Sequence, residues 1–274
     1  SFSPKVIGWK DGRKPTAPDG FTITKFADDL DHPRWLYVMP DGAVLVAESD
    51  KRGSADRITR LVDSGNDGVA ESRNVFLDGL NKPFGMALLG DTFYVGNMDA
   101  VTRFPFTDNA TEITADGEDI LELPVGGYNN HWTLNVIAAP DGETLYVSVG
   151  SASDHSEYGM AEEERRANIL RINPDGSDEK IYASGLRNPV GMDFHPETGE
   201  LFTVVNERDR LGDDLVPDYL TSVQEDGFYG WPYSYYGQNL DPRLADRQRP
   251  DLVEQAIVPD YALGAHTASL GLVF

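Results

Sequence analysis

The chain has 274 residues, 40% of them hydrophobic and 25% charged, which is ordinary for a globular protein. Its 46 Asp and Glu against 23 Lys and Arg give a formal net charge of −23. Such a surface repels nucleic acids and anionic membranes, so we expect neither as a partner. The absence of cysteine excludes disulfides and thiolate sites. No apolar run approaches the roughly 20 residues that cross a bilayer, so we expect no membrane insertion.

The first segment, residues 1–20, is predicted to be an N-terminal extension, and residues 21–274 a single incomplete β-propeller domain. The extension has no signal-peptide core, so any export signal is absent from this stretch. The remainder repeats one unit four times: a polar turn, a short alternating strand, a Pro/Asp/Gly turn and an apolar strand. These units occupy residues 31–49, 81–98, 130–150 and 187–206.

Further strands are predicted after three of these hairpins, at residues 57–62, 100–106 and 168–173. Only residues 158–167 have a helical pattern. About four strands per unit of about 50 residues is typical of a propeller blade, whereas a β-sandwich would not repeat the same hairpin. The sequence therefore predicts an all-β propeller.

The fourth unit continues irregularly through residues 217–258, and a fifth is expected to begin near His266. A propeller must close to remove its edges, and the sequence stops at Phe274 within an expected strand. We therefore expect this chain to supply about four to four and a half blades, with the C-terminal part of the ring absent.

Arg187 and Asn188 lie in a turn where the repeat places the start of an inner strand, facing the central channel. Arginine offers a rigid fork of donors that suits carboxylates and quinone oxygens. The competing interpretation is a structural ion pair between Arg187 and an acid such as Asp214.

The loop 207–214 is dense in oxygen donors, which hard cations such as Ca²⁺ prefer. Its spacing is not that of an EF-hand, so a solvated acidic loop is an equal alternative. The aromatic segment 229–236 either stacks on a flat cofactor or a sugar ring, or fills space between blades.

His131 lies at the matching rim of the third unit and could take a proton from a substrate hydroxyl. Most lone histidines are merely packed or solvated. The position of His131 at the rim is what favours a role in proton transfer. His32 and His266 are also at rims and are weaker candidates, whereas His155 and His195 look inert.

Several motifs together resemble those of the soluble pyrroloquinoline-quinone-dependent sugar dehydrogenases, in particular the sorbosone and aldose sugar dehydrogenase-like branches. These motifs are GLRNPVG, NERDRLGDD and DGFYGWPYSYYG, accompanied by HPRWL, KPFGM, NNHWTLN and LGAHTASLGL. The similarity extends from about residue 20 to residue 274.

The resemblance implies a six-bladed propeller with pyrroloquinoline quinone (PQQ) over the central channel, a Ca²⁺ ion holding it, and a periplasmic or secreted location. By position, His131 resembles the general base of the family. Arg187 resembles the arginine that contacts the quinone carbonyl, and Asn188 its cofactor-binding neighbour. Thr267 falls near a cofactor-contacting threonine.

The same resemblance implies a metal and cofactor role for the loop after residue 206. Its residues 208–210 are similar to a segment whose backbone carbonyls bind Ca²⁺, although better-known members carry Gly-Pro there. We therefore take Arg208 as a cofactor and metal contact, with Asp209, Asp213 and Asp214 as further metal ligands.

The resulting prediction is an enzyme that oxidises a sugar or related alcohol or aldehyde by hydride transfer to the quinone, with Arg187 and Ca²⁺ stabilising the oxyanion. The alternatives are a Ca²⁺-dependent propeller hydrolase of lactones or esters, and a non-catalytic binding propeller. Because the family continues for about two more blades with further basic residues, we expect the 274 residues alone to bind the cofactor poorly.

Overall fold

The computed structural model describes residues 12–125 and 127–274. The predicted all-β class is confirmed, because these residues form four successive sheets with four antiparallel strands each, which we call the first to fourth blades. The first two blades contain β1 (Pro33–Val38), β2 (Val44–Glu48), β3 (Arg57–Val62), β4 (Ser72–Leu77), β5 (Met86–Leu89), β6 (Thr92–Gly96), β7 (Ala100–Pro105) and β8 (Glu118–Glu122).

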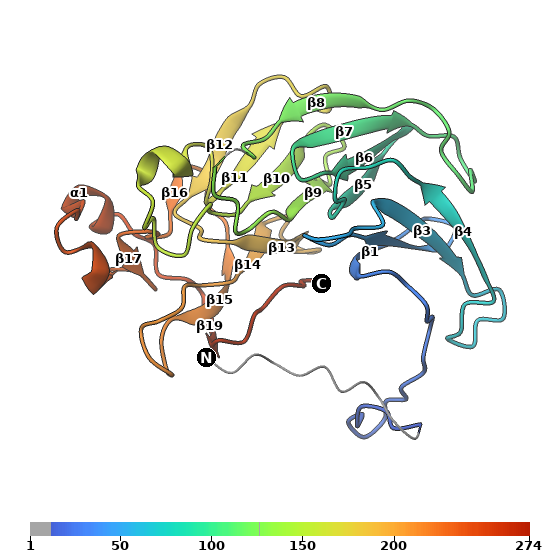
Figure 1. The fold of residues 1–274 in the computed structure, drawn as a ribbon, viewed down its shortest axis with the longest axis horizontal. Coiled ribbons are helices and arrows are strands. Elements are labelled where there is room, and N and C mark those ends of the chain that lie inside the picture. The colour runs from blue at the N-terminus through green and yellow to red at the C-terminus, as the bar shows by residue number, and fades with distance from the viewer. Residues whose placement is uncertain (1–11, 126) are drawn as a thin grey trace.

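The other two blades contain β9 (Leu134–Ala138), β10 (Leu145–Val149), β11 (Asn168–Ile172), β12 (Lys180–Ser184), β13 (Pro189–Phe194), β14 (Leu201–Val205), β15 (Pro217–Ser222) and β19 (Tyr261–Ala265). The four blades follow one another around an arc that is open on one side (Figure 1). The total of six blades stays a prediction.

The Pro-Asp-Gly turns predicted to link the first two strands of a blade have the expected local structure. In the first blade, the N–H of Gly42 donates to the carbonyl of Met39 (2.8 Å), and the carboxylate of Asp41 accepts the N–H of Ala43 (3.0 Å). Gly42 has a φ of 85°, which glycine adopts without steric cost. The third blade repeats this turn at residues 139–144.

Three apolar core clusters lie between neighbouring blades. Phe76 and Phe93 pack between the first and second blades, Val136 lies between the second and third, and Ile169 and Tyr219 lie between the third and fourth. The inner strands are also joined across blades, since the N–H of Gly85 donates to the carbonyl of Leu134 (3.0 Å). Each blade therefore buries both faces of its sheet only by stacking on its neighbours.

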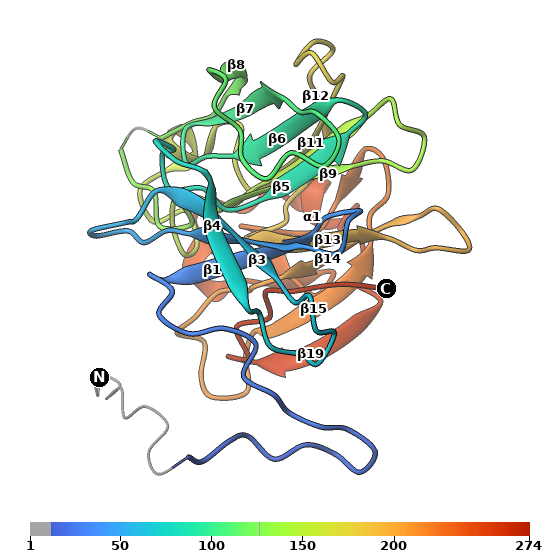
Figure 2. The ribbon, with the colours of Figure 1, turned by 90° about the vertical axis from the view of Figure 1, so that its right-hand side faces the viewer.

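The candidate site residues predicted from the sequence lie in loops at one end of the blades. Because the strands are antiparallel, the start of the first strand and the end of the second lie at the same sheet edge. The loops before β9 and β13 and the loops after β10 and β14 therefore meet at this edge, which we call the upper rim. Figure 2 shows the same blades after a quarter turn.

Two local expectations were wrong. The segment 158–167 contains only a short 3₁₀ helix, η1 (Met160–Glu163), and Arg165 and Ala167 after it have positive φ, which cannot continue a helix. The segment 223–260 is not simply a continuation of the fourth unit. It returns to the third blade, where β16 (Gly227–Phe228) pairs in parallel with β12.

The remaining part of that segment holds β17 (Ser234–Tyr235), β18 (Asn239–Leu240), a 3₁₀ helix η2 (Pro242–Leu244) and the one-turn helix α1 (Pro250–Val253). It ends at β19, which completes the fourth blade beside β15. The last residues then run along β13, close enough that a Cβ on Gly191 would meet the backbone of Leu270 and Leu272. This is where a fifth unit was expected to begin, and residues 266–274 form no strand here.

The predicted extension, residues 1–20, lies partly outside the described residues, and its boundary stays a prediction. Among the residues that are described, no helix has the length and apolar character needed to cross a membrane.

Candidate functional site

His131 lies half-buried on the upper rim, held by the loop that follows β10. Its Nδ1 is 2.8 Å from the carbonyl oxygen of Ser151 and 3.0 Å from the hydroxyl of Ser151. That hydroxyl donates its own hydrogen to the carbonyl of Ser153 (2.6 Å), so it can only accept from His131. Both contacts therefore require the proton of the neutral ring to be on Nδ1, which leaves the lone pair on Nε2.

The pKa of His131 is lowered from its ordinary value of 6.5 to about 3. Burial is the largest cause, the positive charge of Arg187 is next, and Lys51 adds to it, while the bond to Ser151 acts in the opposite direction. His131 is therefore a neutral acceptor at any physiological pH.

Arg187 is buried at the start of β13, and its guanidinium is almost fully hydrogen-bonded. Its Nε donates to the carbonyl of Asp154 (3.0 Å), and its Nη1 donates to the carbonyls of Asn206 (3.0 Å) and Glu207 (2.8 Å). Its Nη2 donates to a carboxylate oxygen of Asp154 (2.9 Å). The acid paired with Arg187 is thus Asp154 and not Asp214, and one Nη2 hydrogen remains without a described partner.

Asp154, which the sequence analysis did not select, connects the third and fourth blades at the rim. Its carboxylate accepts Arg187, the backbone N–H of Asp209 (3.0 Å) and Nη1 of Arg243 (3.3 Å), and its carbonyl accepts Nε1 of Trp231 (3.1 Å). Burial acts to raise the pKa of Asp154, but these donors outweigh it and the pKa lies below its usual value. Asp154 is therefore charged and fixes the orientation of Arg187.

Asn188 and His131 meet over Gly150. A Cβ on Gly150 would collide with Oδ1 of Asn188 and with Cβ of His131, so only glycine permits this close packing. Asn188 is buried, and its Oδ1 has no hydrogen-bond partner among the described residues. Buried polar atoms are normally satisfied, so this oxygen is an unsatisfied acceptor beside His131.

The side chain of Arg208 is fully buried and directed into the segment 232–241. Its guanidinium binds the carboxylate of Glu207 (2.8 Å), the carbonyls of Pro232 (2.9 Å) and Ser234 (2.8 Å), and Asp241 (3.3 Å). These contacts use four of its five N–H donors, and because the side chain is fully buried the fifth is not accessible to a cofactor. A role for its backbone carbonyl stays a prediction.

The carboxylates of the acidic loop 207–214 do not form a close cluster among the described residues. Asp209, Asp213 and Asp214 are exposed, and in the described residues the one group of three acids whose ligand atoms lie within 4.8 Å of one another is elsewhere, at Asp63, Asp67 and Glu71. The carbonyl of Asp209 accepts Nη1 of Arg243 (2.9 Å), which places a positive charge beside it.

Thr267 reaches the rim from the segment after β19. Its hydroxyl donates to the buried carboxylate of Asp218 (3.1 Å), which also accepts the backbone N–H of Glu207 (2.8 Å) and Nδ2 of Asn206 (3.3 Å). Asn206 in turn contacts Arg187. Thr267, Arg187 and His131 are therefore brought to one end of the blades, although Thr267 and Arg187 are 80 residues apart in sequence.

The aromatic segment 229–236 fills space between the blades. Tyr229, Trp231 and Tyr233 are buried, and Tyr229 belongs to the core between the third and fourth blades. Of the other histidines, His195 lies in the turn at the opposite end of the fourth blade, where it packs on Phe202 and Phe274.

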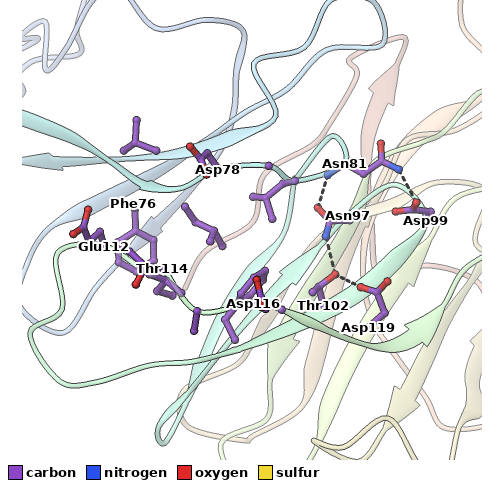
Figure 3. A pocket seen from close by; sticks show the side chains of 18 residues that line it. Phe76, Asp78, Asn81, Asn97, Asp99, Thr102, Glu112, Thr114, Asp116 and Asp119 are labelled. Atoms are coloured by element: carbon purple, nitrogen blue, oxygen red, sulfur yellow. Dashed lines mark hydrogen bonds between the residues drawn. The ribbon is translucent and has the colours of Figure 1, made fainter.

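A well-formed cleft lies away from this rim. It has a volume of about 670 Å³ and lies between β4 of the first blade and β7 and β8 of the second. Figure 3 shows its polar wall, where Nδ2 of Asn81 donates to Asp99 (2.6 Å) and Thr102 connects Asn97 to Asp119. It contains none of the predicted site residues.

A model of the TrAA12-like family matches residues 15–226. The chain belongs to the TrAA12-like family. Among curated proteins, it is 24% identical over 276 residues to an uncharacterized protein of Borreliella burgdorferi. The match covers 94% of this chain and 66% of that protein, so the chain spans just under two thirds of this relative.

Solved structures share the fold of this TrAA12-like chain. The holo PQQ domain of pyranose dehydrogenase from Coprinopsis cinerea has a TM-score of 0.76 at 17% identity, over 94% of this chain and 72% of that one. The calcium structure of a Trichoderma reesei enzyme of Carbohydrate-Active Enzymes Family AA12 has a TM-score of 0.78 at 19% identity, over 94% and 74%.

A more distant neighbour is the apo form of the soluble aldose sugar dehydrogenase of Escherichia coli. It has a TM-score of 0.59 at 18% identity, over 88% of this chain and 75% of that one. The family match and these neighbours confirm the predicted resemblance to the soluble PQQ-dependent sugar dehydrogenases.

Proposed function

We propose that this protein oxidises a sugar, or a related alcohol or aldehyde, with PQQ as the hydride acceptor, at the upper rim of the third and fourth blades. The observation that carries the proposal is His131, whose Nδ1 is tied to Ser151 and whose neutral Nε2 is free, beside the charge of Arg187. Membership of the TrAA12-like family and the likeness to the PQQ domain of the Coprinopsis cinerea pyranose dehydrogenase support the choice of cofactor.

The residues at this rim fit such a cofactor. The quinone is flat and carries three carboxylates, so it needs local cations in a chain of net charge −23. Arg187 and Lys51 are both close enough to His131 to lower its pKa, and Oδ1 of Asn188 is buried without a partner. The site therefore offers positive charge and an unsatisfied polar atom together.

The proposed chemistry assigns a step to each residue. When bound, the quinone supplies an acceptor for the hydride of the substrate carbon. Nε2 of His131 takes the hydroxyl proton, and the bond from Nδ1–H to Ser151 stabilises the imidazolium that forms. The remaining Nη2 hydrogen of Arg187 donates to the oxygen on which negative charge develops.

A pKa of about 3 would make His131 a weak base, but it describes the site without an anion. The carboxylates of a bound quinone oppose the charges of Arg187 and Lys51. They would therefore act to raise the pKa of His131 from this value, while burial, its largest cause, would remain.

Binding of Ca²⁺ by Asp209, Asp213 and Asp214 also stays a proposal: the three side chains are exposed, and Nη1 of Arg243 donates to the carbonyl of Asp209. No step is assigned to the metal. Binding of Ca²⁺ by the carbonyls of residues 208–210 stays a proposal, as does a periplasmic or secreted location, which cell fractionation tests.

The test is reduction of an artificial dye by the protein after addition of PQQ, with and without Ca²⁺, on a panel of aldoses. We expect dye reduction that requires PQQ and disappears in His131→Ala. Dye reduction by no sugar at saturating PQQ would contradict the proposal, and hydrolysis of lactones without PQQ would favour the hydrolase alternative.

A further inference from the structure

The loop 129–132, which carries His131, is surrounded by three cationic side chains. Cζ of Arg34 lies 5.3 Å from the centre of the Trp132 ring, and Nζ of Lys51 is 3.4 Å from the carbonyl of Asn129. Nη1 of Arg166 donates to Oδ1 of Asn129 (2.8 Å). The guanidinium of Arg34 thus lies over the ring of the residue next to the proposed base.

These cations differ in their availability to a ligand. Arg166 is buried, and its second nitrogen donates to the carbonyl of Pro124 (2.5 Å), so its role is to hold the loop. Arg34 and Lys51 are exposed. Within residues 12–125 and 127–274, neither has a carboxylate within 4 Å, although the chain has twice as many acids as bases.

The positions of Arg34 and Lys51 in the fold place them on the inner side of the arc. Arg34 lies on β1 and Lys51 follows β2, so both belong to the first blade, whereas Asn129 and Trp132 precede the third. The second blade lies between these two blades along the arc (Figure 1). Blades that are not neighbours meet only toward the centre of the arc, so these contacts cross the mouth of the central channel.

We propose that Arg34 and Lys51 form a carboxylate-binding site at the mouth of the channel, beside His131. Two exposed cations that no acid neutralises, held on one loop of a strongly acidic protein, make a local positive potential that attracts anions. The guanidinium fork of Arg34 suits a planar carboxylate, and Lys51 adds a second charge.

A carboxylate could reach this site from two sources. One is the quinone, in which case the chain itself supplies cofactor anchors from its first blade. The other is an acidic sugar such as a uronic acid, in which case the pair determines substrate specificity. The use of PQQ and of sugar oxidation as probes rests on the proposed function.

The first arm measures PQQ binding through quenching of tryptophan fluorescence, since Trp132 lies under Arg34. The variants are Arg34→Gln, Lys51→Gln and the double variant, with Arg52→Gln as the matched control. Arg52 is exposed in the same loop and makes no described contact with the loop 129–132. Circular dichroism checks that each variant folds.

Each single variant should weaken PQQ binding about tenfold, because a hydrogen bond to a charged group contributes an effect of this order. Lys51→Arg should keep the affinity, Arg52→Gln should change it less than about twofold, and binding should weaken as salt screens the charges.

The second arm compares oxidation of glucuronate and glucose at saturating PQQ. Unchanged PQQ binding together with a selective loss of kcat/KM for glucuronate assigns the site to the substrate. If the variants change neither quantity, or the wild-type protein binds neither anion, the proposal is overturned. If the Arg34 and Lys51 variants weaken PQQ binding but the wild-type protein oxidises no sugar, the carboxylate-binding site is supported and the proposed function is rejected.

Discussion

The upper rim and the cleft between the first and second blades differ in the cations that they hold. At the rim, Arg187 and Lys51 lower the pKa of His131, and Arg34 lies over the ring of the neighbouring Trp132. The cleft has no Lys, Arg or His among its described lining residues. Five acids line it instead: Asp78, Asp99, Glu112, Asp116 and Asp119 (Figure 3).

This difference shows that neither a well-formed cavity nor the net charge of the chain locates the candidate site. The acids of the cleft are solvated or paired with neutral donors such as Asn81 and Thr102. At the rim, Arg187 is buried and hydrogen-bonded to Asp154, and the pKa of His131 is strongly lowered. Perturbed titratable groups held by specific partners are the better indicator of chemistry.

The largest effect should come from His131. His131→Ala removes the proposed base, so turnover should fall by about 10²- to 10⁴-fold while PQQ affinity changes little. Steady-state dye reduction checks this. His195→Ala, at the opposite end of the fourth blade, is the control and should keep full activity. Equal losses in both variants would contradict the role of His131.

The next effect concerns the buried charges that support the rim. Arg208→Met removes the ion-pair partner of the buried Glu207, whereas Asp241 keeps Arg243, and an uncompensated buried carboxylate costs about 3–5 kcal/mol. Urea unfolding measures the loss. Arg103→Met, near the cleft, breaks the more exposed pair with Glu118 and should cost less than about 1 kcal/mol. Similar losses of unfolding free energy in the two variants would mean that the burial of an ion pair does not determine its contribution to stability.

A smaller effect should appear in the pH dependence of stability. The folded-state pKa of His131 is about 3 and its ordinary value is 6.5, so between these pH values only the unfolded state binds this proton. Its contribution to stability is therefore complete above pH 6.5 and is lost as the pH falls toward 3, by up to about 1.4 kcal/mol per pH unit. Urea unfolding of His131→Gln should show a shallower decline with falling pH than the wild type, and parallel curves would contradict the shift.

The smallest effect belongs to the cleft. Thr102→Val removes the hydroxyl that accepts from Asn97 (2.8 Å) and donates to Asp119 (2.6 Å), which should cost about 1–2 kcal/mol of stability. PQQ affinity should stay unchanged, as measured by fluorescence titration. A weaker affinity in Thr102→Val would show that the cleft and the rim are coupled.

The repeat made most of the fold predictable. The Pro-Asp-Gly pattern correctly predicts the turns of the hairpins at Gly42 and Gly142. The strand at residues 57–62 has the predicted bounds. The path of residues 223–260 was not predictable, because its short strand β16 pairs with β12, which lies more than 40 residues earlier in the chain. Hydrophobic periodicity indicates local secondary structure and does not predict which distant strands pair.

The site was predictable only where a residue type and a rim position coincide. His131 and Arg187 were selected on that basis and Thr267 through the family resemblance, and all three lie at one end of the blades. Asp154 was missed because it precedes its partners by 33 to 89 residues and sits in a polar loop without periodicity. Arg208 has charged neighbours in the sequence, which suggests a solvated loop, whereas its side chain is fully buried.

The most direct test of the account is the visible absorption spectrum of the protein after addition of PQQ and then of an aldose. The account predicts that the spectrum changes to that of the reduced quinone in the wild type, and that in His131→Ala the quinone binds but stays oxidised. Reduction at equal rates in both proteins, or no change in the wild type with any sugar, would contradict it.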